Sequence, residues 1–581
     1  MGAAHRLILL LLICGLLAPA CATQEEWNRF WDQHKDKGQQ PDAMPAPILN
    51  TTGLRGTVGQ LVTIDGLRLT QVRGYGLVVG LVDSGGSDGP DIVKQYMVKE
   101  IRRHQEIGAP GFPAGEILGG RDAVMVAVTG LIPAGAKKGD RFDVVATALG
   151  SQAKSLVGGR LVLCDLKLYA DTPQGILEGK TLATASGPVF VSPFDRAGRA
   201  TSKVDLRTGT VLGGGVVMEP RKIRLVLNDP RYSTAQQIMN RINSRFAGVD
   251  PLADAKSPDS IDLEIPDEMR DRKTLFLERV LHTTISDSPS FLEKRAEDLG
   301  EEIVEPGAEL ESIGVAWEAI GKIILPHVRA HYADASQESS YFAGRTGMRL
   351  GDASGLKVVA EHALSPQSPF RLSAIHELGY AVKLHSAGEC LRKLLDDHDD
   401  DIRIRAYLAL RKHNHSAITT QVLDSDNLIL DVVDSRGPFL VYVQRLGEPR
   451  IALFGKQMRC IPPAIFPGER NDGRALRTLI TAAQGDSHLT VIYTNKQNGA
   501  QSPPLVAPLV VSDLVRFLAD RFDMNDHRDP TGLALPYSEV VDILYAFCKT
   551  GPIAAGFITE EMEASAKTDE DGQRQRQESE Y

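Results

Sequence analysis

The sequence has few cysteines, which argues against a scaffold built on disulfides. Only 6 occur in 581 residues, and no two of them form a Cys-x-x-Cys pair. Disulfide frameworks and zinc sites usually show close, recurring cysteine spacings. We therefore expect no disulfide framework, with Cys164 in a strand and Cys548 in a helix as free thiols.

Positive charge and long apolar runs are also scarce. The chain has 65 Lys and Arg residues against 75 Asp and Glu residues, a net charge of −10 at pH 7. Because nucleic-acid binding depends on basic surface, we expect no nucleic-acid partner. No internal run reaches the ~18 apolar residues that cross a bilayer. Hydrophobic residues still make up 42% of the chain, enough for the cores of roughly three or four domains.

Patterns typical of catalysis are missing as well. His376 and Glu377 begin like a zinc-protease helix, but Tyr380 stands where the second histidine is needed. His413 and His415 have no carboxylate or histidine pattern to complete a metal site. The acidic residues 396–401 lack the glycine and closing glutamate of a calcium loop, so we interpret them as a solvated turn before a helix. The sequence thus predicts no enzyme, no catalytic residue, no cofactor and no metal site.

The N-terminus predicts export. Arg6 precedes an unbroken apolar run, Leu7–Leu17, which is too short for a membrane span and typical of a secretory signal peptide. Ala18–Ala20 has the small-x-small pattern at which signal peptidase cleaves. Cys21 is also placed like the lipid-bearing cysteine of a bacterial lipoprotein. The sequence leaves ordinary cleavage and lipidation open as alternatives.

Alternating apolar residues predict strands in the first large segment, residues 54–285. Val124, Val126 and Val128 share one face of a predicted strand over 123–129. Further strands are expected at 142–148, 223–227 and 261–265, with a turn-rich connection at 133–140. One helix is expected to be capped by Asp91 and to run to about Gly108, and another to be capped by Ser233 or Thr234 and closed by Gly248. This mixture predicts an α+β region.

The middle of the chain predicts helical repeats. Two segments share the pattern apolar-Arg-x-x-Ala-x-x-x-Leu, and their arginines, Arg371 and Arg403, lie 32 residues apart. This spacing is typical of HEAT-type helical hairpins, in which the small side chains of Ala374 and Ala406 let helices pack closely. Two or three repeats are too few for an independent solenoid, so neighbouring segments must cap them.

Composition suggests the following boundaries: signal peptide 1–20, polar leader or tether 21–53, α+β region 54–285, acidic helical connector 286–335, HEAT-like repeats 336–424, C-terminal α+β domain 425–559 and disordered tail 560–581. In the C-terminal domain we expect strands at 439–443, 451–454 and 489–493 and helices at 512–522 and 538–549. The fold class is multidomain α+β: an α/β-rich N-terminal half, a short HEAT-like α-hairpin segment and a C-terminal α+β domain.

Two glycine-rich segments are the most informative features. Residues 73–81 read Arg-Gly-Tyr-Gly-Leu-Val-Val-Gly-Leu, and residues 149–159 read Leu-Gly-Ser-Gln-Ala-Lys-Ser-Leu-Val-Gly-Gly. The first is spaced one residue too long for a dinucleotide loop, and an apolar strand pattern follows instead of a helix. The second lacks Gly-Lys-Ser/Thr. Glycines in strands instead indicate bends, bulges or close backbone approach.

In this order the two segments resemble the flagellar basal-body P-ring protein family. Residues 73–81 are similar to the family's Val-Gly-Tyr-Gly-Leu-Val-Val-Gly-Leu, and residues 151–159 to its Gly-Asp-Ala-x-Ser-Leu-x-Gly-Gly, with Gln152 in place of Asp. The loop that follows the first segment is altered in this chain. The family-motif positions are Gly74, Tyr75, Gly76, Gly80, Ser155, Leu156, Gly158 and Gly159.

The resemblance covers residues 54–285 and ends there. The family usually closes with an Asn-Glu-Arg-Thr-Gly-Thr strand. In this chain Arg-Thr-Gly-Thr occurs at Arg207–Thr210, which is too early in the chain to be that strand. We recognise no family in the C-terminal region. The resemblance implies a structural subunit of a periplasmic ring of identical copies. Such a ring would surround the flagellar rod in contact with outer-membrane ring proteins and peptidoglycan, possessing an outer-membrane anchor if Cys21 is lipidated. The alternative is an exported periplasmic or outer-membrane scaffold that binds proteins through its helical repeats.

Overall fold

The computed structural model describes residues 53–81, 84–108, 118–172, 175–194, 204–246, 248, 250–381, 384–423, 427–467, 478–494, 499–520 and 532–560. The expected signal peptide, Cys21, nearly all of the expected leader and nearly all of the expected tail lie outside these residues. In the described part of the chain, we find no helix with the length and apolar character that crossing a membrane requires.

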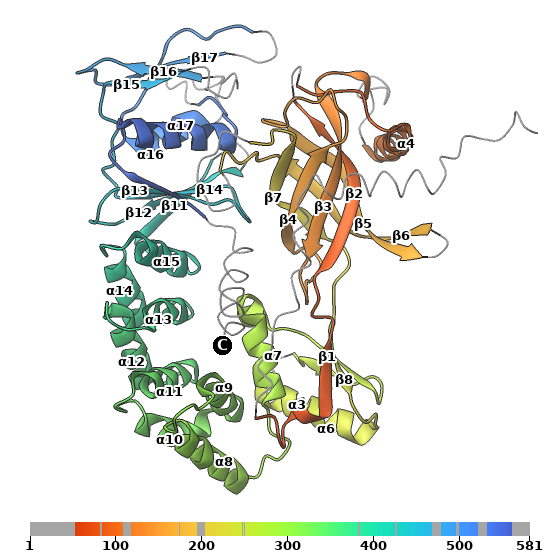
Figure 1. The fold of residues 1–581 in the computed structure, drawn as a ribbon, viewed down its shortest axis with the longest axis vertical. Helices are drawn as coiled ribbons and strands as arrows, with labels where there is room; N and C mark the ends of the chain where they lie inside the picture. Colours follow the sequence, from red (N-terminus) through yellow and green to blue (C-terminus); the bar gives the residue numbers. More distant parts are fainter. Residues whose placement is uncertain are drawn as a thin grey trace, which may run out of the picture.

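A closed six-stranded barrel forms the first part of the fold (Figure 1). Its strands, in order around the barrel, are β2 (Thr70–Val79), β3 (Ala123–Ile132), β4 (Arg141–Ala148), β7 (Thr208–Val217), β6 (Gly175–Pro188) and β5 (Arg160–Thr172). The alternation expected around Val124, Val126 and Val128 is confirmed, because these side chains fill the barrel interior together with the alternate residues of β4. The intervening residues Met125 and Ala127 are also buried, against helix α4 (Asp91–Gly108).

The barrel is inserted into a second, smaller sheet. This small sheet has the order β1 (Val62–Asp65), β8 (Ile223–Leu227), β10 (Ser260–Leu263), β9 (Ala253–Asp254), and β1 pairs directly with β8. Because the whole barrel lies between β1 and β8 in sequence, the chain leaves the small sheet, forms the barrel and returns to the neighbouring strand. Helices α3 (Val58–Leu61), α6 (Tyr232–Phe246) and α7 (Lys273–Leu281) complete its core, and a short 3₁₀ helix, η1 (Asp267–Arg272), precedes α7.

A stack of helices follows. The helices of this helical segment are α8 (Pro289–Glu302), α9 (Leu310–Ile320), η2 (Lys322–Ile324), α10 (Leu325–Ala330), α11 (Gln337–Arg349), α12 (Ala353–Leu364), α13 (Arg371–Leu378), α14 (His385–Leu394) and α15 (Asp400–Arg411). α13 contacts α15, and α12 contacts α14, as expected for stacked helical hairpins.

The C-terminal domain contains two sheets and two helices. One sheet has the order β11 (Ile418–Val422), β12 (Ile429–Val433), β14 (Arg450–Phe454), β13 (Leu440–Val443), β19 (Gly556–Thr559). The other has the order β15 (Ala464–Phe466), β16 (Thr478–Ala482), β17 (Leu489–Tyr493), β18 (Leu505–Ala507). Helices α16 (Val511–Ala519) and α17 (Tyr537–Thr550) share one core with both sheets.

The chain folds back on itself. In Figure 1 the helical segment and the C-terminal domain form one column, green to blue, beside a second column made of the small sheet and the barrel. The columns meet at both ends, where α7 contacts α9 and where the turn after β13 reaches β7 of the barrel.

The multidomain α+β fold class is confirmed, and so are the strands and helices expected in the C-terminal domain, within a few residues. Two expected caps are wrong. Helix α4 begins at Asp91 itself, so Asp91 lies in its first turn. Helix α6 begins at Tyr232, so Ser233 and Thr234 lie in its first turn and cannot cap it from outside. Arg207 directly precedes β7 and Thr208–Thr210 begin it, so this Arg-Thr-Gly-Thr sequence forms part of the barrel wall.

The two repeat arginines have equivalent roles. The Arg371 Nε donates to the Ala363 carbonyl at 3.2 Å, and the Arg403 Nε donates to the Leu395 carbonyl at 3.1 Å. Each acceptor lies eight residues earlier, at the end of the preceding helix, where carbonyls lack helical partners. The expected 32-residue repeat is therefore confirmed. The sheet of β12, β13 and β14 covers the last helix, sharing its core.

Replacing Ala374 or Ala406 with Trp should destabilise the helical segment by at least about 1–3 kcal/mol, because both side chains are fully buried between helices. Ser373→Trp, on the exposed face of α13, is the matched control and should unfold like the unmodified protein. Thermal unfolding followed by circular dichroism measures the effect. Unchanged unfolding of both alanine variants would show that these positions do not lie at helix interfaces.

Candidate functional site

The two glycine motifs lie against each other in the barrel wall. β2, which carries the first motif, pairs with β5, and Val79 is opposite Arg160, the residue that directly follows the second motif. The β2–β5 register shifts between Arg73 and Leu77, which marks a bulge at the glycines. Segments about seventy residues apart in sequence therefore form one local structure.

Several of these glycines are required by close contacts. A Cβ on Gly74 would overlap the carbonyl oxygen of Asp165, and one on Gly76 would lie 2.7 Å from the Leu161 Cδ1. A Cβ on Gly159 would lie 2.6 Å from the Leu81 Cδ2, which belongs to the first motif. Gly80 and Gly158 have φ angles of 81° and 73°, a region that favours glycine. The backbone approach expected from the sequence is thus present.

The other motif residues anchor this end of the barrel. Leu156 is fully buried in the barrel core, and its N–H donates to the Leu206 carbonyl at 2.8 Å. The Ser155 hydroxyl accepts a hydrogen bond from the Val157 N–H at 3.1 Å. Tyr75 is buried on the outer side, with its ring edge-on to Tyr96 of α4 at 5.9 Å. These contacts give the motif residues structural roles.

The loop that departs from the family pattern is tied to the second motif. The Asp88 carboxylate accepts hydrogen bonds from the N–H and hydroxyl of Ser151, both at 2.6 Å, and from the N–H of Gln152 at 2.9 Å. Slight burial raises the pKa of Asp88, but these hydrogen bonds outweigh it and lower the pKa overall. Gln152 takes part through its backbone, so the change from Asp at this position leaves the contact intact.

A buried ion cluster joins the small sheet to the helical segment. Glu318 on α9 accepts from Arg279 of α7 at 2.6 Å and from Arg349 of α11 at 2.8 Å. Glu377 on α13 accepts from Arg272 of η1 at 2.6 Å and also pairs with Arg349. We call these five residues the junction cluster. Because Arg272 and Arg279 come from one side and the glutamates from the other, the cluster fixes how the two parts meet.

The junction cluster stays ionised over a wide pH range. Burial alone would raise the pKa of Glu318, but Arg349, Arg279 and Arg345 hold it at about 2. Burial would likewise raise the pKa of Glu377, yet Arg349 and Arg272 lower it. The contact between the small sheet and the helical segment also contains two charge-assisted hydrogen bonds. Arg245 of α6 donates both, to the carbonyl oxygens of Glu318 and Ala319 at the end of α9.

A second junction joins the barrel to the C-terminal domain. Phe190, just after β6, still pairs with Thr210 of β7 through its backbone. Its side chain and that of Phe194 lie in the core of the C-terminal domain, with the Phe190 ring 5.1 Å from the Tyr537 ring. Asp143 of β4 accepts from the Gly213 N–H at 2.6 Å and from the Gly447 N–H at 2.8 Å. Burial raises the pKa of Asp143, while these two hydrogen bonds oppose the shift.

The residues weighed as metal or calcium sites have other roles. Glu377 belongs to the junction cluster, and His413 Nε2 lies 2.8 Å from the Gly379 carbonyl oxygen. Asp399 caps α15 through the Asp401 N–H, as expected for a turn before a helix. Among the described residues no group of His, Cys, Asp and Glu is arranged for a metal ion. The described cysteines, Cys164, Cys390, Cys460 and Cys548, are free thiols.

Replacing Glu318 with Gln should destabilise the protein by about 3–5 kcal/mol, because it leaves buried arginine charge without its partner. Denaturant unfolding of the full-length mature protein measures the loss. The exposed Glu297 on α8 supplies the control, since Glu297→Gln should change stability by less than about 0.5 kcal/mol.

The same pair of variants has a pH signature. The pKa of Glu318 is about 2 in the folded protein and about 4.3 in an unfolded chain, so its contribution is complete above that unfolded value. It is lost as the pH falls from about 4.3 towards 2. The Glu318→Gln protein should lack this part of the acid destabilisation. An acid profile identical to that of the unmodified protein would contradict the assigned role.

Replacing Gly74 with Ala should destabilise the barrel by about 1–3 kcal/mol, because the new Cβ collides with backbone that cannot rotate away. Gly119→Ala is the control, since a Cβ there meets open space at ordinary φ. Thermal unfolding and hydrogen exchange of β2 and β5 report the change. Equal stability of both variants would argue that the motif glycines are not required by this close approach.

Comparison with known proteins points to one family. A family model described as flagellar P-ring protein matches residues 57–291, which span the small sheet, the barrel and α7. The flagellar P-ring protein of Geobacter metallireducens is 29% identical over 235 residues, covering 38% of this chain and 59% of the relative. That of Aquifex aeolicus is 31% identical over 229 residues, covering 38% of this chain and 59% of the relative.

A longer match also exists. The flagellar P-ring protein 1 of Bradyrhizobium diazoefficiens is 30% identical over 318 residues, covering 52% of this chain and 79% of the relative. This chain thus matches about three fifths of some relatives and most of others. The matched range of the family model ends at residue 291, close to the end of the resemblance seen in the sequence. The chain belongs to the flagellar P-ring protein family.

Proposed function

We propose that this protein is a structural, non-catalytic subunit of the flagellar P ring. In this proposal it is exported by the signal peptide at residues 1–20 and forms a periplasmic ring of identical copies around the rod. The ring supports rotation of the rod and contacts outer-membrane ring proteins and peptidoglycan. Lipidation of Cys21, if it occurs, adds an outer-membrane anchor.

The family match over the barrel and the small sheet is the observation that carries this proposal. Both glycine motifs lie within the matched range and pack together there. A closed ring needs a head-to-tail contact between two different surfaces of the same subunit, repeated by rotation. The closed barrel, with its closely packed glycine motifs, supplies an ordered surface for such a contact. The relatives named above are all flagellar P-ring proteins, which favours this function over the scaffold hypothesis.

Nearly all of the helical segment and the whole C-terminal domain lie after residue 291, where the match to the family model ends, yet they are held to the matched part at two junctions. We propose that they form one appendage on the ring subunit. Because the appendage is fixed at both ends, it would move with the ring rather than swing from it.

Deleting the gene in the native host should abolish or severely reduce swimming and remove the P ring from isolated basal bodies. Reintroducing the protein with a C-terminal tag should restore both, and the tagged protein should co-purify with basal bodies. Mass spectrometry of that protein should find an N-terminus at Cys21 or close after it. The Gly119→Ala protein, which is the control variant for Gly74→Ala, should also restore swimming. A deletion strain that swims normally, with unaltered basal bodies, would refute the proposed function.

A further inference from the structure

Strands β5 and β6 continue beyond the barrel as a two-stranded ribbon. β2 pairs with β5 as far as Lys167, and β7 pairs with β6 as far as Ala183. Past these points residues 168–172 and 175–180 pair with each other and, in the described part of the chain, with no third strand. We call these two stretches the ribbon. Its five β5 residues extend roughly 17 Å past the last pairing with the barrel.

The ribbon lacks the support that a larger sheet provides. An isolated two-stranded ribbon is marginally stable in water. Its outer edges present backbone N–H and C=O groups that a further strand could pair with. Leu168, at its base, is 44% exposed. The ribbon sequence also contains Tyr169, Ile176 and Leu177, residue types that are often buried. A ribbon of this composition is expected to be covered by another surface.

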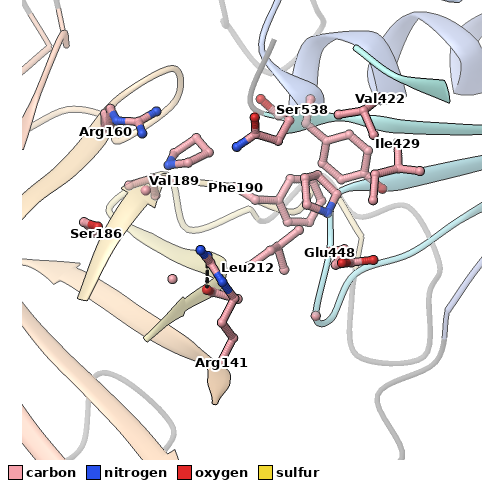
Figure 2. Close-up of a pocket in the computed structure, with 18 residues that line it drawn as sticks. Arg141, Arg160, Ser186, Val189, Phe190, Leu212, Val422, Ile429, Glu448 and Ser538 are labelled. Atoms are coloured by element: carbon pink, nitrogen blue, oxygen red, sulfur yellow. Dashed lines mark hydrogen bonds between the residues drawn. The ribbon is translucent and has the colours of Figure 1, made fainter. Parts of the chain in front are cut away.

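The large described parts of the same chain lie on other sides of the barrel. Figure 1 shows the ribbon projecting on the side away from the C-terminal domain and the helical segment. The C-terminal domain occupies the opposite side, where Phe190 and Leu212 from the barrel pack into its core (Figure 2). At the base of the ribbon Lys180 pairs with Glu219, just after β7. This placement points to a second molecule as the surface that covers the ribbon.

We propose that the ribbon is an arm that docks on the neighbouring copy of this chain. A closed ring needs two different contact surfaces on each subunit, of which one meets the other on the next copy. The ribbon supplies one of them, because it reaches beyond the barrel of its own subunit. Its apolar residues pack on the neighbour, and its free edges offer backbone groups for pairing with a strand there. This inference rests on the proposed ring and assigns one of its contact surfaces.

Photo-crosslinking in cells tests which molecule the arm touches. The tagged full-length protein is produced in the deletion strain with the photoreactive residue p-benzoyl-L-phenylalanine in place of Leu168. Irradiation should join two copies of this chain, seen as a tagged dimer whose cross-linked peptides both come from this protein. The same photoreactive residue in place of Glu297, exposed on α8, is the matched control and should give no dimer above the unirradiated level. Equal dimer at both positions, or cross-links from position 168 only to other proteins, would overturn the proposal.

A shortened variant tests whether the ring needs the arm. Gly179 lies opposite Leu168, so replacing residues 169–178 with Asn-Gly closes the hairpin with a two-residue turn. The shortened protein should unfold at the same temperature as the unmodified protein, because the removed residues pair only with each other in the described chain. In the deletion strain it should restore neither swimming nor the P ring.

The arm and the proposed function fail in different ways. A deletion strain that swims normally would refute the P-ring function itself. If the unmodified protein restores rings and swimming and the shortened protein does so equally, the arm alone is refuted. If the shortened protein does not fold, the cross-link from position 168 decides, since it is made with the ribbon intact: a dimer of this chain supports the arm, and its absence overturns it.

Discussion

The arrangement of the whole chain depends on the junction cluster. Its glutamates lie on α9 and α13, and its arginines come from η1, α7 and α11, so five elements must be in place before the charges are balanced. Burying unpaired charge costs several kcal/mol, so alternative placements of the helical segment are penalised. Hydrophobic contact would hold these helices together in many orientations, whereas paired charges with defined geometry select one.

The second junction completes a closed path through the molecule. Phe190 and Phe194 are donated by the barrel to the core of the C-terminal domain, and Asp143 bridges Gly213 and Gly447 across the contact. A segment joined at one end could rotate about its link. With both ends fixed, the helical segment acts as a brace between the small sheet and the C-terminal domain. The residues that match the family model and the residues that follow them are therefore joined at two places.

Local features of this fold follow from the sequence, but closure of the barrel does not. The alternation at β3 and β4 predicted strands, and Arg371 with Arg403 predicted the helical repeat. β7 escaped notice because its glycines interrupt the alternation. Barrel closure depends on pairings such as β2 with β5, between strands distant in sequence, and no local pattern encodes these.

Some residues of the candidate site could be predicted from the sequence, and others are identified only by the tertiary structure. The motif glycines were recognisable from their spacing, because close approach demands glycine whatever the partner. The junction cluster was not, since Glu318 and Glu377 look like ordinary helix charges, and only the tertiary structure brings their arginines beside them.

Electron cryotomography with subtomogram averaging of basal bodies in intact cells tests the central claim most directly. The claim is that this chain is a P-ring subunit whose added residues are fixed to the barrel at both junctions. The account predicts a ring in which every subunit carries an ordered lobe, joined to the ring at two places and absent from cells that lack the protein. A ring identical in cells with and without the protein, or a lobe attached at a single point, would contradict it.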